Sequence, residues 1–190
     1  MTGGTCALSS LAIAVLALLV ERPMHPYEMA STLRERGQDR LVKLTTGSLY
    51  RTVERLVADD LARVEGASRA GNRPERTVYG VTRRGRCRLE DAVSFTVREP
   101  GQEYPRFPVA LGEAHVLSPR RLTQDLDARV STLREQEREL STGLARAAAA
   151  GTPEAYLLAP HFLLHQRRTD IAWLTDLAAR LTSQELPWPQ

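Results

Sequence analysis

The sequence predicts a mostly α-helical protein with a small β-hairpin, and two patterns indicate this fold class. Residues 45–88 read in order as a capped helix, two short strands around an arginine-bearing loop, and the start of another helix. That order defines a winged helix-turn-helix unit, in which the hairpin is the wing. After residue 118, leucines recur every seven residues, which is typical of long helices that pack against a partner helix. We therefore expect a winged helix-turn-helix domain followed by an antiparallel helical dimerisation domain.

The first predicted helix contains an unbroken apolar run at residues 11–20, with Ser9 or Ser10 as its cap. The run is about half the ~20 residues that a membrane span needs, and neither a preceding basic residue nor a cleavage site accompanies it. We therefore expect a buried core helix rather than a signal peptide. A second helix is expected from Pro26 to Gly37, because proline favours helix starts and glycine favours the position beyond an end.

The third predicted helix carries the residues best placed to read DNA. Thr45 or Thr46 would cap its first turn. Its apolar residues are spaced by four and three and would face a core: Leu49, Val53 and Leu56. At 100° per residue, Ser48, Arg51 and Arg55 lie on the opposite face, where guanidinium groups reach guanine edges or phosphates in a major groove. The alternative is a solvated amphipathic helix with no ligand.

The predicted wing consists of strands at residues 62–65 and 77–81, where polar and apolar residues alternate. The loop that joins them contains Gly66, Gly71, Asn72 and Pro74. Three arginines against one glutamate give this loop and its flanks a cationic tip: Arg69, Arg73 and Arg76 against Glu75. Such a tip suits contact with phosphates or with a minor groove, although a charged hairpin tip alone often serves solubility only.

Basic charge is concentrated in the same segment. Residues 34–88 contain 14 Lys plus Arg and 7 Asp plus Glu, whereas the whole chain has a net charge of +3. Residues 100–190 contain 10 basic and 11 acidic residues. Clustered positive charge is the electrostatic signature of a nucleic-acid-binding surface. The residues that we expect to contact DNA are Lys43, Thr45, Thr46, Ser48, Tyr50, Arg51, Arg55, Arg69, Asn72, Arg73 and Arg76.

A fourth helix is expected from its cap, Thr82, to about Arg98. Its apolar stripe would contain Leu89, Ala92, Val93 and Val97. The prolines and glycine that follow should interrupt regular structure: Pro100, Gly101, Pro105 and Pro108. We therefore expect a DNA-binding domain with its linking helix at residues 1–99 and a helical domain for dimerisation and effector binding at residues 100–190.

The C-terminal region predicts two long helices and a homodimer. Ser118 and Pro119 start the first helix, whose heptad leucines are Leu126, Leu133 and Leu140, and Gly151 ends it. Thr152 and Pro153 begin the next helix, which Pro160 kinks or restarts, and its apolar stripe contains Ile171, Leu174, Leu177, Ala178 and Leu181. Two antiparallel helices can satisfy each other within one chain. An inverted pair of DNA half-sites nevertheless requires two copies, so we expect a homodimer.

Candidate residues for a small hydrophobic or aromatic effector are Phe107, Tyr156, Phe162, His165 and Trp173, whose rings suit a planar ligand. Each has a structural alternative, and Trp173 beside apolar helix positions is more often interface core. His161 and His165 share a helix face, but no third metal ligand is evident, so we expect no metal. Cys6 and Cys87 have no metal-like spacing and indicate a reduced, cytoplasmic protein rather than a redox switch.

Four stretches of the sequence resemble the PadR family of bacterial transcriptional regulators: MHPYEMASTLRERG, LTTGSLYRTVERLVADDLA, RTVYGVTRRGRCRL and IAWLTDL. The resemblance implies a winged-helix domain, a helical dimer with a small-molecule site in some members, and repression from an inverted-repeat operator. The chain departs from the shortest members by its long C-terminal region, so effector contacts carry over poorly.

The sequence contains no Gly-rich phosphate loop, nucleophile elbow or His-Glu-x-x-His motif, so we expect neither an enzyme nor a cofactor. The expected function is that of a sequence-specific, ligand-responsive repressor that binds double-stranded DNA. The alternative is a winged-helix protein-interaction module with only non-specific affinity for DNA.

Overall fold

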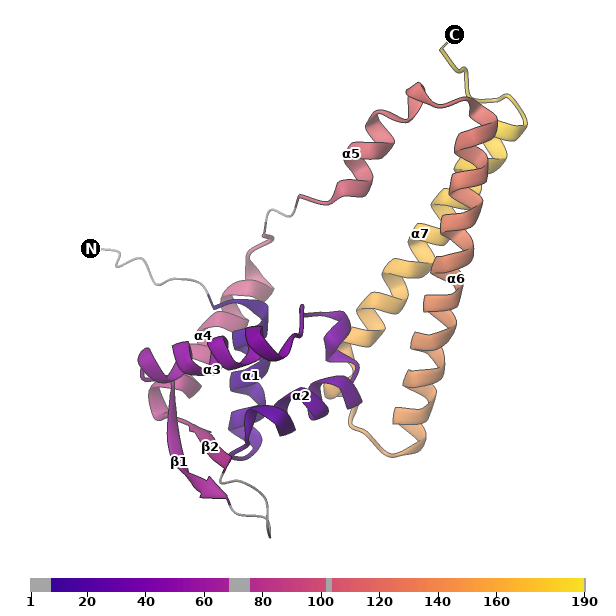
Figure 1. Cartoon of the computed structure of the whole chain (residues 1–190). Helices are drawn as coiled ribbons and strands as arrows, with labels where there is room; N and C mark the ends of the chain where they lie inside the picture. Colours follow the sequence, from indigo (N-terminus) through magenta and orange to yellow (C-terminus); the bar gives the residue numbers. More distant parts are fainter. Residues whose placement is uncertain (1–7, 69–75, 102–103, 190) are drawn as a thin grey trace. The chain divides into compact units, whose positions relative to one another are not determined.

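The computed structural model of the chain describes residues 8–68, 76–101 and 104–189 (Figure 1). Helices make up most of these residues, and the two strands form one antiparallel hairpin. This confirms the predicted fold class. The chain divides into two compact units, Met1–Gln102 and Glu103–Gln190, each with a hydrophobic core of its own.

The first unit begins with α1 (Ser10–Glu21), α2 (Pro26–Glu35) and the short 3-10 helix η1 (Gln38–Arg40), continues with α3 (Thr46–Ala58) and the hairpin, and ends with α4 (Arg83–Arg98). Ser9 rather than Ser10 caps α1, since its hydroxyl accepts a hydrogen bond from Ala12 N at 3.2 Å. Pro26 occupies the first turn of α2, and Gly37 beyond its end has a φ of 66°, which favours glycine. The start and end signals in the sequence therefore act as predicted.

The hairpin consists of β1 (Ala62–Ser68) and β2 (Arg76–Val81). Gly66, which the sequence analysis placed in the wing loop, lies in β1 at a bulge, where its φ of 148° is easily adopted by glycine alone. Met24 forms an isolated antiparallel bridge with β2: its N–H donates to Tyr79 O at 2.9 Å and its carbonyl accepts from Tyr79 N at 3.0 Å. The root of the wing is thereby joined to the segment between α1 and α2.

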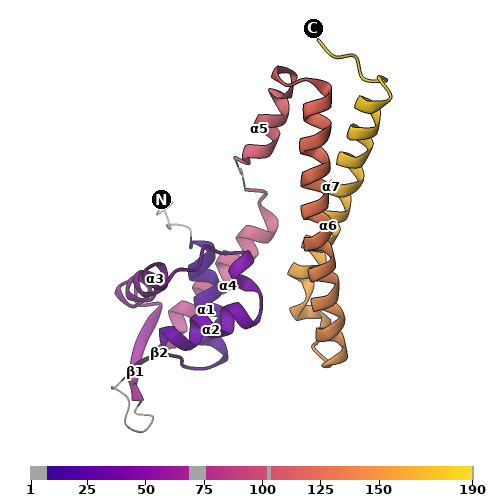
Figure 2. The ribbon, with the colours of Figure 1, turned by 45° about the vertical axis from the view of Figure 1, so that its right-hand side comes forward.

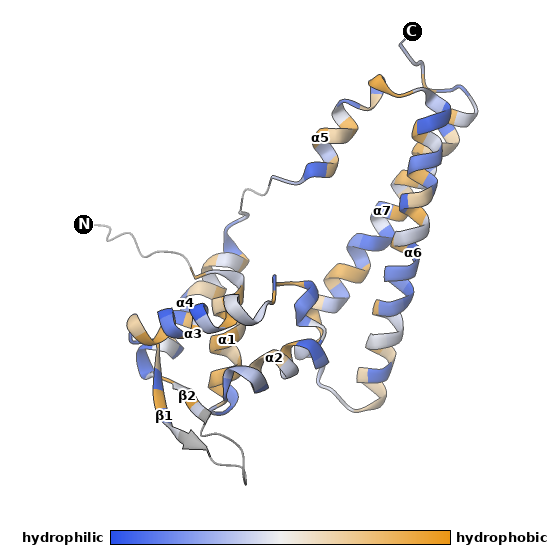
Figure 3. Ribbon diagram, viewed as in Figure 1, coloured by the Kyte–Doolittle hydropathy of each residue, from blue (hydrophilic) through white to orange (hydrophobic). Residues whose placement is uncertain are grey.

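Helix α1 is the centre of the first core, as its apolar run predicted. Val15 and Leu16 are 0% exposed, and Leu49 and Val53 of α3 are 1% exposed. Figure 3 shows the hydrophobic character of α1 along most of its length. Among the described residues, no helix combines the length and apolarity that crossing a membrane demands.

The predicted apolar stripe of α4 is correct only in part. Ala92 is buried and Leu89 is half-buried, but Val93 and Val97 are 44% and 83% exposed. The buried face of α4 also contains Gly85, which the stripe omitted. Helical periodicity identified the start of this face but did not reveal where the supporting core ends.

The second unit contains α5 (Arg106–Gly112), η2 (Ala114–Val116), α6 (Pro119–Ala149), η3 (Glu154–Tyr156) and α7 (Leu158–Thr182). The expectation of irregular structure around Pro105 and Pro108 was wrong, because α5 forms there. Pro108 lies in its first turn, where the missing N–H has no helical partner to lose. Pro160 likewise lies in the first turn of α7, so the helix restarts rather than kinks.

Helices α6 and α7 run side by side in opposite directions (Figures 1 and 2). Their shared core consists mainly of Leu122, Leu126, Val130 and Leu133 from α6 with Leu174, Ala178 and Leu181 from α7. Two polar contacts cross the pair further along: Arg167 donates to Gln136 at 3.0 Å and Arg168 to Glu137 at 2.9 Å. The first two heptad leucines, at 126 and 133, therefore find an apolar partner within the chain.

Candidate nucleic-acid interface

The start of α3 is fixed by a reciprocal capping box. The Thr45 hydroxyl accepts a hydrogen bond from Ser48 N at 3.1 Å, and the Ser48 hydroxyl accepts one from Thr45 N at 3.0 Å. The Ser48 hydroxyl also lies 3.3 Å from Lys43 O, to which it can donate. Ser48, which we expect to contact DNA, also holds the helix start in place, while Lys43, Thr45 and Thr46 are exposed around it.

The outward face of α3 carries its two arginines. Arg51 and Arg55 are exposed, and the opposite face is buried in the core, as the spacing predicted. The guanidinium of Arg51 lies over Gly47: a Cβ atom at Gly47 would be 3.5 Å from Arg51 Nη1. Gly47 therefore leaves room for Arg51 to reach back along the helix towards its N-terminal end. This is the end from which recognition helices contact base edges.

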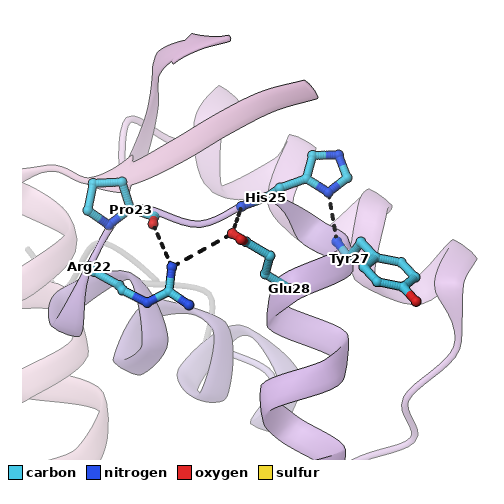
Figure 4. A network of polar contacts seen from close by, with 5 residues as sticks. All are labelled: Arg22, Pro23, His25, Tyr27 and Glu28. Carbon is cyan, nitrogen blue, oxygen red and sulfur yellow. Dashed lines mark hydrogen bonds and ion pairs between the residues drawn. The ribbon is translucent and has the colours of Figure 1, made fainter. Parts of the chain in front are cut away.

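Tyr50, another expected contact residue, packs on the start of α2. Its ring meets that of His25 edge to face, with centroids 6.4 Å apart, and 39% of the residue stays exposed. His25 caps α2, with Nδ1 accepting from Tyr27 N at 3.0 Å (Figure 4). Glu28 completes this capping box by accepting from His25 N at 3.1 Å. The contact thus links the starts of the two helices of the helix-turn-helix.

The same network extends to Arg22, whose Nη1 lies 3.7 Å from Glu28 Oε2 and donates to Pro23 O at 3.5 Å (Figure 4). His25, Tyr27 and Glu28 were quoted only as part of a family-like stretch, and their roles were not foreseen. The signal that could have found them is Glu28 three residues after His25, which is the spacing of a capping box.

The structure describes only one of the four wing residues that we expect to contact DNA, Arg76. Arg76 is the first residue of β2 and pairs with Ser68 of β1. The other three expected contacts of the wing, Arg69, Asn72 and Arg73, lie outside the described residues. Arg63 on β1 pairs with Glu65 at 2.9 Å, so much of its charge is neutralised locally.

The end of α3 is tied to the start of α4 by a tight junction. Thr82 N donates to Leu61 O at 3.1 Å, and the Thr82 hydroxyl donates to Asp60 O at 2.7 Å while accepting from Gly85 N at 2.9 Å. Gly85 lies against the Leu61 carbonyl, where a Cβ atom would overlap the oxygen. The cap role of Thr82 was predicted, but the requirement for glycine at 85 depends on a contact 24 positions back along the chain.

The candidate effector residues fall in different places within the second unit. Phe107 borders a groove of about 720 Å³, lined chiefly by Tyr104, Arg106, Phe107, Val109, Glu113 and Arg129. The Arg129 guanidinium stacks on the Phe107 ring, with Cζ 3.6 Å from the ring centroid. The other four, Tyr156, Phe162, His165 and Trp173, are exposed on η3 and α7 and do not line this groove. No signal in the sequence pointed to Arg129, because only the fold brings it from α6 against Phe107 of α5.

No group of three or more His, Cys, Asp or Glu side chains is suited to metal binding in the part of the chain that the structure describes. Cys87 is an exposed free thiol on α4, and Cys6 lies outside the described residues.

A capped helix with exposed arginines, supported by a second helix and followed by a hairpin, defines the winged helix-turn-helix class. Residues 15–91 match the transcriptional regulator PadR-like family. The match covers this winged-helix segment, so the resemblance predicted from the sequence is confirmed there. The family consists of transcriptional regulators and not of enzymes.

Solved structures share the fold over nearly the whole chain. Bacillus subtilis PadR in complex with operator DNA is similar at a TM-score of 0.79 and 16% identity, covering 92% of this chain and 98% of that one. Bacillus subtilis PadR in complex with p-coumaric acid gives 0.74 and 17%, covering 90% and 98%. The Vibrio cholerae virulence activator AphA gives 0.68 and 18%, covering 92% and 99%. The curated proteins contain no match.

Proposed function

We propose that the protein is a sequence-specific transcriptional regulator of the cytoplasm. It binds an inverted-repeat operator as a homodimer, represses transcription there, and responds to a small aromatic or hydrophobic ligand. The proposal of DNA binding rests on α3, whose start is fixed by the capping box of Thr45 and Ser48 and whose outward face presents Arg51 and Arg55. Guanidinium forks on a rigid helix match the acceptor pair of guanine in the major groove. The matching family and the operator complex of Bacillus subtilis PadR support the same assignment.

The test is binding of the purified protein to the DNA upstream of its own gene and to a scrambled duplex, across a salt series. A regulator prefers its operator at every salt concentration, because base contacts survive where phosphate contacts weaken. Equal and steeply salt-sensitive binding to both duplexes would instead favour the protein-interaction module.

A matched pair of variants identifies the responsible surface. Arg51→Ala with Arg55→Ala should abolish the preference for the operator, each lost bidentate contact being worth about 1–3 kcal/mol. Arg120→Ala with Arg138→Ala removes the same charge from exposed positions of α6 and should leave the preference intact. Circular dichroism checks that both variants fold.

For the homodimer, we propose that a second copy of the chain covers the exposed apolar face of α7. Leu158 and Phe162 are 65% and 61% exposed, and Trp173 is 51% exposed eleven residues, or about three turns, after Phe162. These side chains share one stripe that α6 leaves open, and an inverted-repeat operator requires two copies of α3. Sedimentation at micromolar concentration should show a dimer for the native chain and a monomer for Phe162→Glu. A native monomer would refute this part of the proposal.

For the effector, we propose the groove beside Phe107. Tyr104 and Phe107 offer aromatic contact, and the Arg129 guanidinium stacked on Phe107 offers a partner for an acidic or polar substituent. A panel of aromatic compounds, with and without a carboxylate, should include one that releases operator DNA from the native protein. Phe107→Ala should weaken that release while operator binding without ligand is unchanged.

A further inference from the structure

Three arginines at the start of α4 form a second cationic surface: Arg83, Arg84 and Arg86, here called the α4 arginine cluster. All three are exposed, and their side chains make no hydrogen bond or ion pair with the residues that the structure describes. Other arginines of the same unit are paired, for example Arg36 with Glu21 at 2.6 Å. Contacts with the described residues of its unit therefore do not explain the cluster.

The stability of α4 does not explain the cluster either. The first turn of a helix favours acidic side chains, because the N-terminal end of the helix dipole is positive. The first turn of α4 contains no acidic residue and two of the three arginines. Asp59 and Asp60 are exposed on the neighbouring turn but form no ion pair with the cluster among the described residues. Exposed cations in an unfavourable position are typical of a surface that meets an anionic partner.

The junction at Thr82 places this cluster at the C-terminal end of α3. Thr82 bonds to both Asp60 and Leu61, so the first turn of α4 cannot move independently of that end. The 13 residues of α3 span about 20 Å, whereas the major groove is about 12 Å wide. A helix that crosses the groove with its N-terminal half inside it therefore extends past the edge of the groove, where the sugar-phosphate backbone runs.

We propose that the α4 arginine cluster binds DNA phosphates that flank the half-site read by α3. The inference rests on the proposed function and adds a contact surface that the sequence analysis did not include. Phosphate contacts of this kind fix the register of the protein on the duplex and carry no sequence information. They lengthen the footprint and increase the salt dependence of binding.

The first test combines a protein change with a DNA change. The variant with Arg83, Arg84 and Arg86 replaced by Ala is compared with the native chain on two duplexes, one limited to the operator and one with flanking base pairs. The native chain should bind the longer duplex more tightly and with a steeper salt slope, whereas the variant should bind both alike. The loss of three phosphate contacts makes the negative slope of log K against log salt less steep by about 2.7.

A matched control separates a local contact from a change in net charge. Exposed Arg120, Arg134 and Arg138 of α6 are replaced by Ala, which removes the same three charges. This control should keep the length dependence of the native chain. A cluster variant with the native length dependence and salt slope would overturn the proposal. A native chain with no operator preference at all would overturn the proposed function instead, so the two failures are distinguishable.

Cys87 provides an independent probe, because this exposed thiol lies on the α4 face between Arg83 and Arg84 at 100° per residue. Cys6→Ser leaves Cys87 as the one reactive thiol. In this background, the longer operator duplex should slow the alkylation of Cys87 by N-ethylmaleimide several-fold. The scrambled duplex at high salt should leave the alkylation rate unchanged. An alkylation rate that saturating operator DNA leaves unchanged would show that the cluster stays away from the duplex.

Discussion

Gly85 and Gly143 are both helical glycines, and their replacement by alanine should change stability in opposite directions. Alanine normally stabilises a helix interior by about 1 kcal/mol relative to glycine. Around Gly143 of α6 a Cβ atom meets nothing within 4 Å, so this gain should be obtained in full. At Gly85 of α4 the Cβ atom would overlap Leu61 O and lie 2.9 Å from Val81 Cγ2.

The magnitude at Gly85 follows from which atoms must move. The obstructing oxygen belongs to the backbone and accepts the hydrogen bond from Thr82 N at 3.1 Å, so it cannot rotate away as a side chain does. Separating α4 from Leu61 strains this bond and loosens the packing, and overpacking of this kind costs about 1–3 kcal/mol. After the helical gain of about 1 kcal/mol is subtracted, Gly85→Ala should destabilise the first unit by up to about 2 kcal/mol. For a unit of roughly 100 residues this lowers Tm by up to about 16 °C.

The assay can separate the two units because both tryptophans, Trp173 and Trp188, belong to the second one. Thermal unfolding is followed by tryptophan fluorescence for the second unit and by hydrogen exchange of α1 peptides for the first. Gly85→Ala should weaken protection of α1 more than it shifts the fluorescence transition, whereas Gly143→Ala should raise that transition. A Gly85→Ala protein as stable as the native chain would refute the reasoning, since the junction would then tolerate a side chain.

Three further predictions concern single contacts. Thr82→Ala should destabilise the first unit by about 1–2 kcal/mol in urea unfolding, and Thr82→Ser should restore most of the loss, because only the hydroxyl serves as cap and tie. Hydrogen bonding from Arg36 lowers the pKa of Glu21, so the pair stabilises the fold at neutral pH and loses this effect as the pH falls through that lowered pKa. Glu21→Gln should therefore reduce the loss of unfolding free energy between neutral and acidic pH. The reduction should be less than about 1 kcal/mol, because the pair is exposed. Trp188→Phe removes the indole N–H that donates to Leu117 O at 2.9 Å. It should lower the unfolding free energy of the second unit by about 1 kcal/mol, measured by circular dichroism. An unchanged unfolding free energy would show that this bond does not stabilise the unit.

Local patterns in the sequence determined the elements. Helix starts were marked by Ser9, Thr45, Thr82 and Ser118, whose hydroxyls cap helices in the structure. These signals can be read from the sequence because a cap acts on amides only two or three residues further along the chain. The core face of α3 followed from spacing alone for the same reason, since helical geometry repeats every 3.6 residues. The candidate DNA-reading face, with Arg51 and Arg55, was thereby defined before any tertiary contact was known.

The tertiary structure decided what each polar group does with its neighbours. It assigned the Ser48 hydroxyl to the helix cap, joined Phe107 to Arg129, and left Val97 exposed where periodicity expected burial. It also showed why residue 85 must be glycine, which no local rule contains. Such contacts join residues that are far apart in the sequence, and they depend on how closely two backbones approach. Periodicity fixes the direction in which a side chain points, but only packing fixes what it meets there.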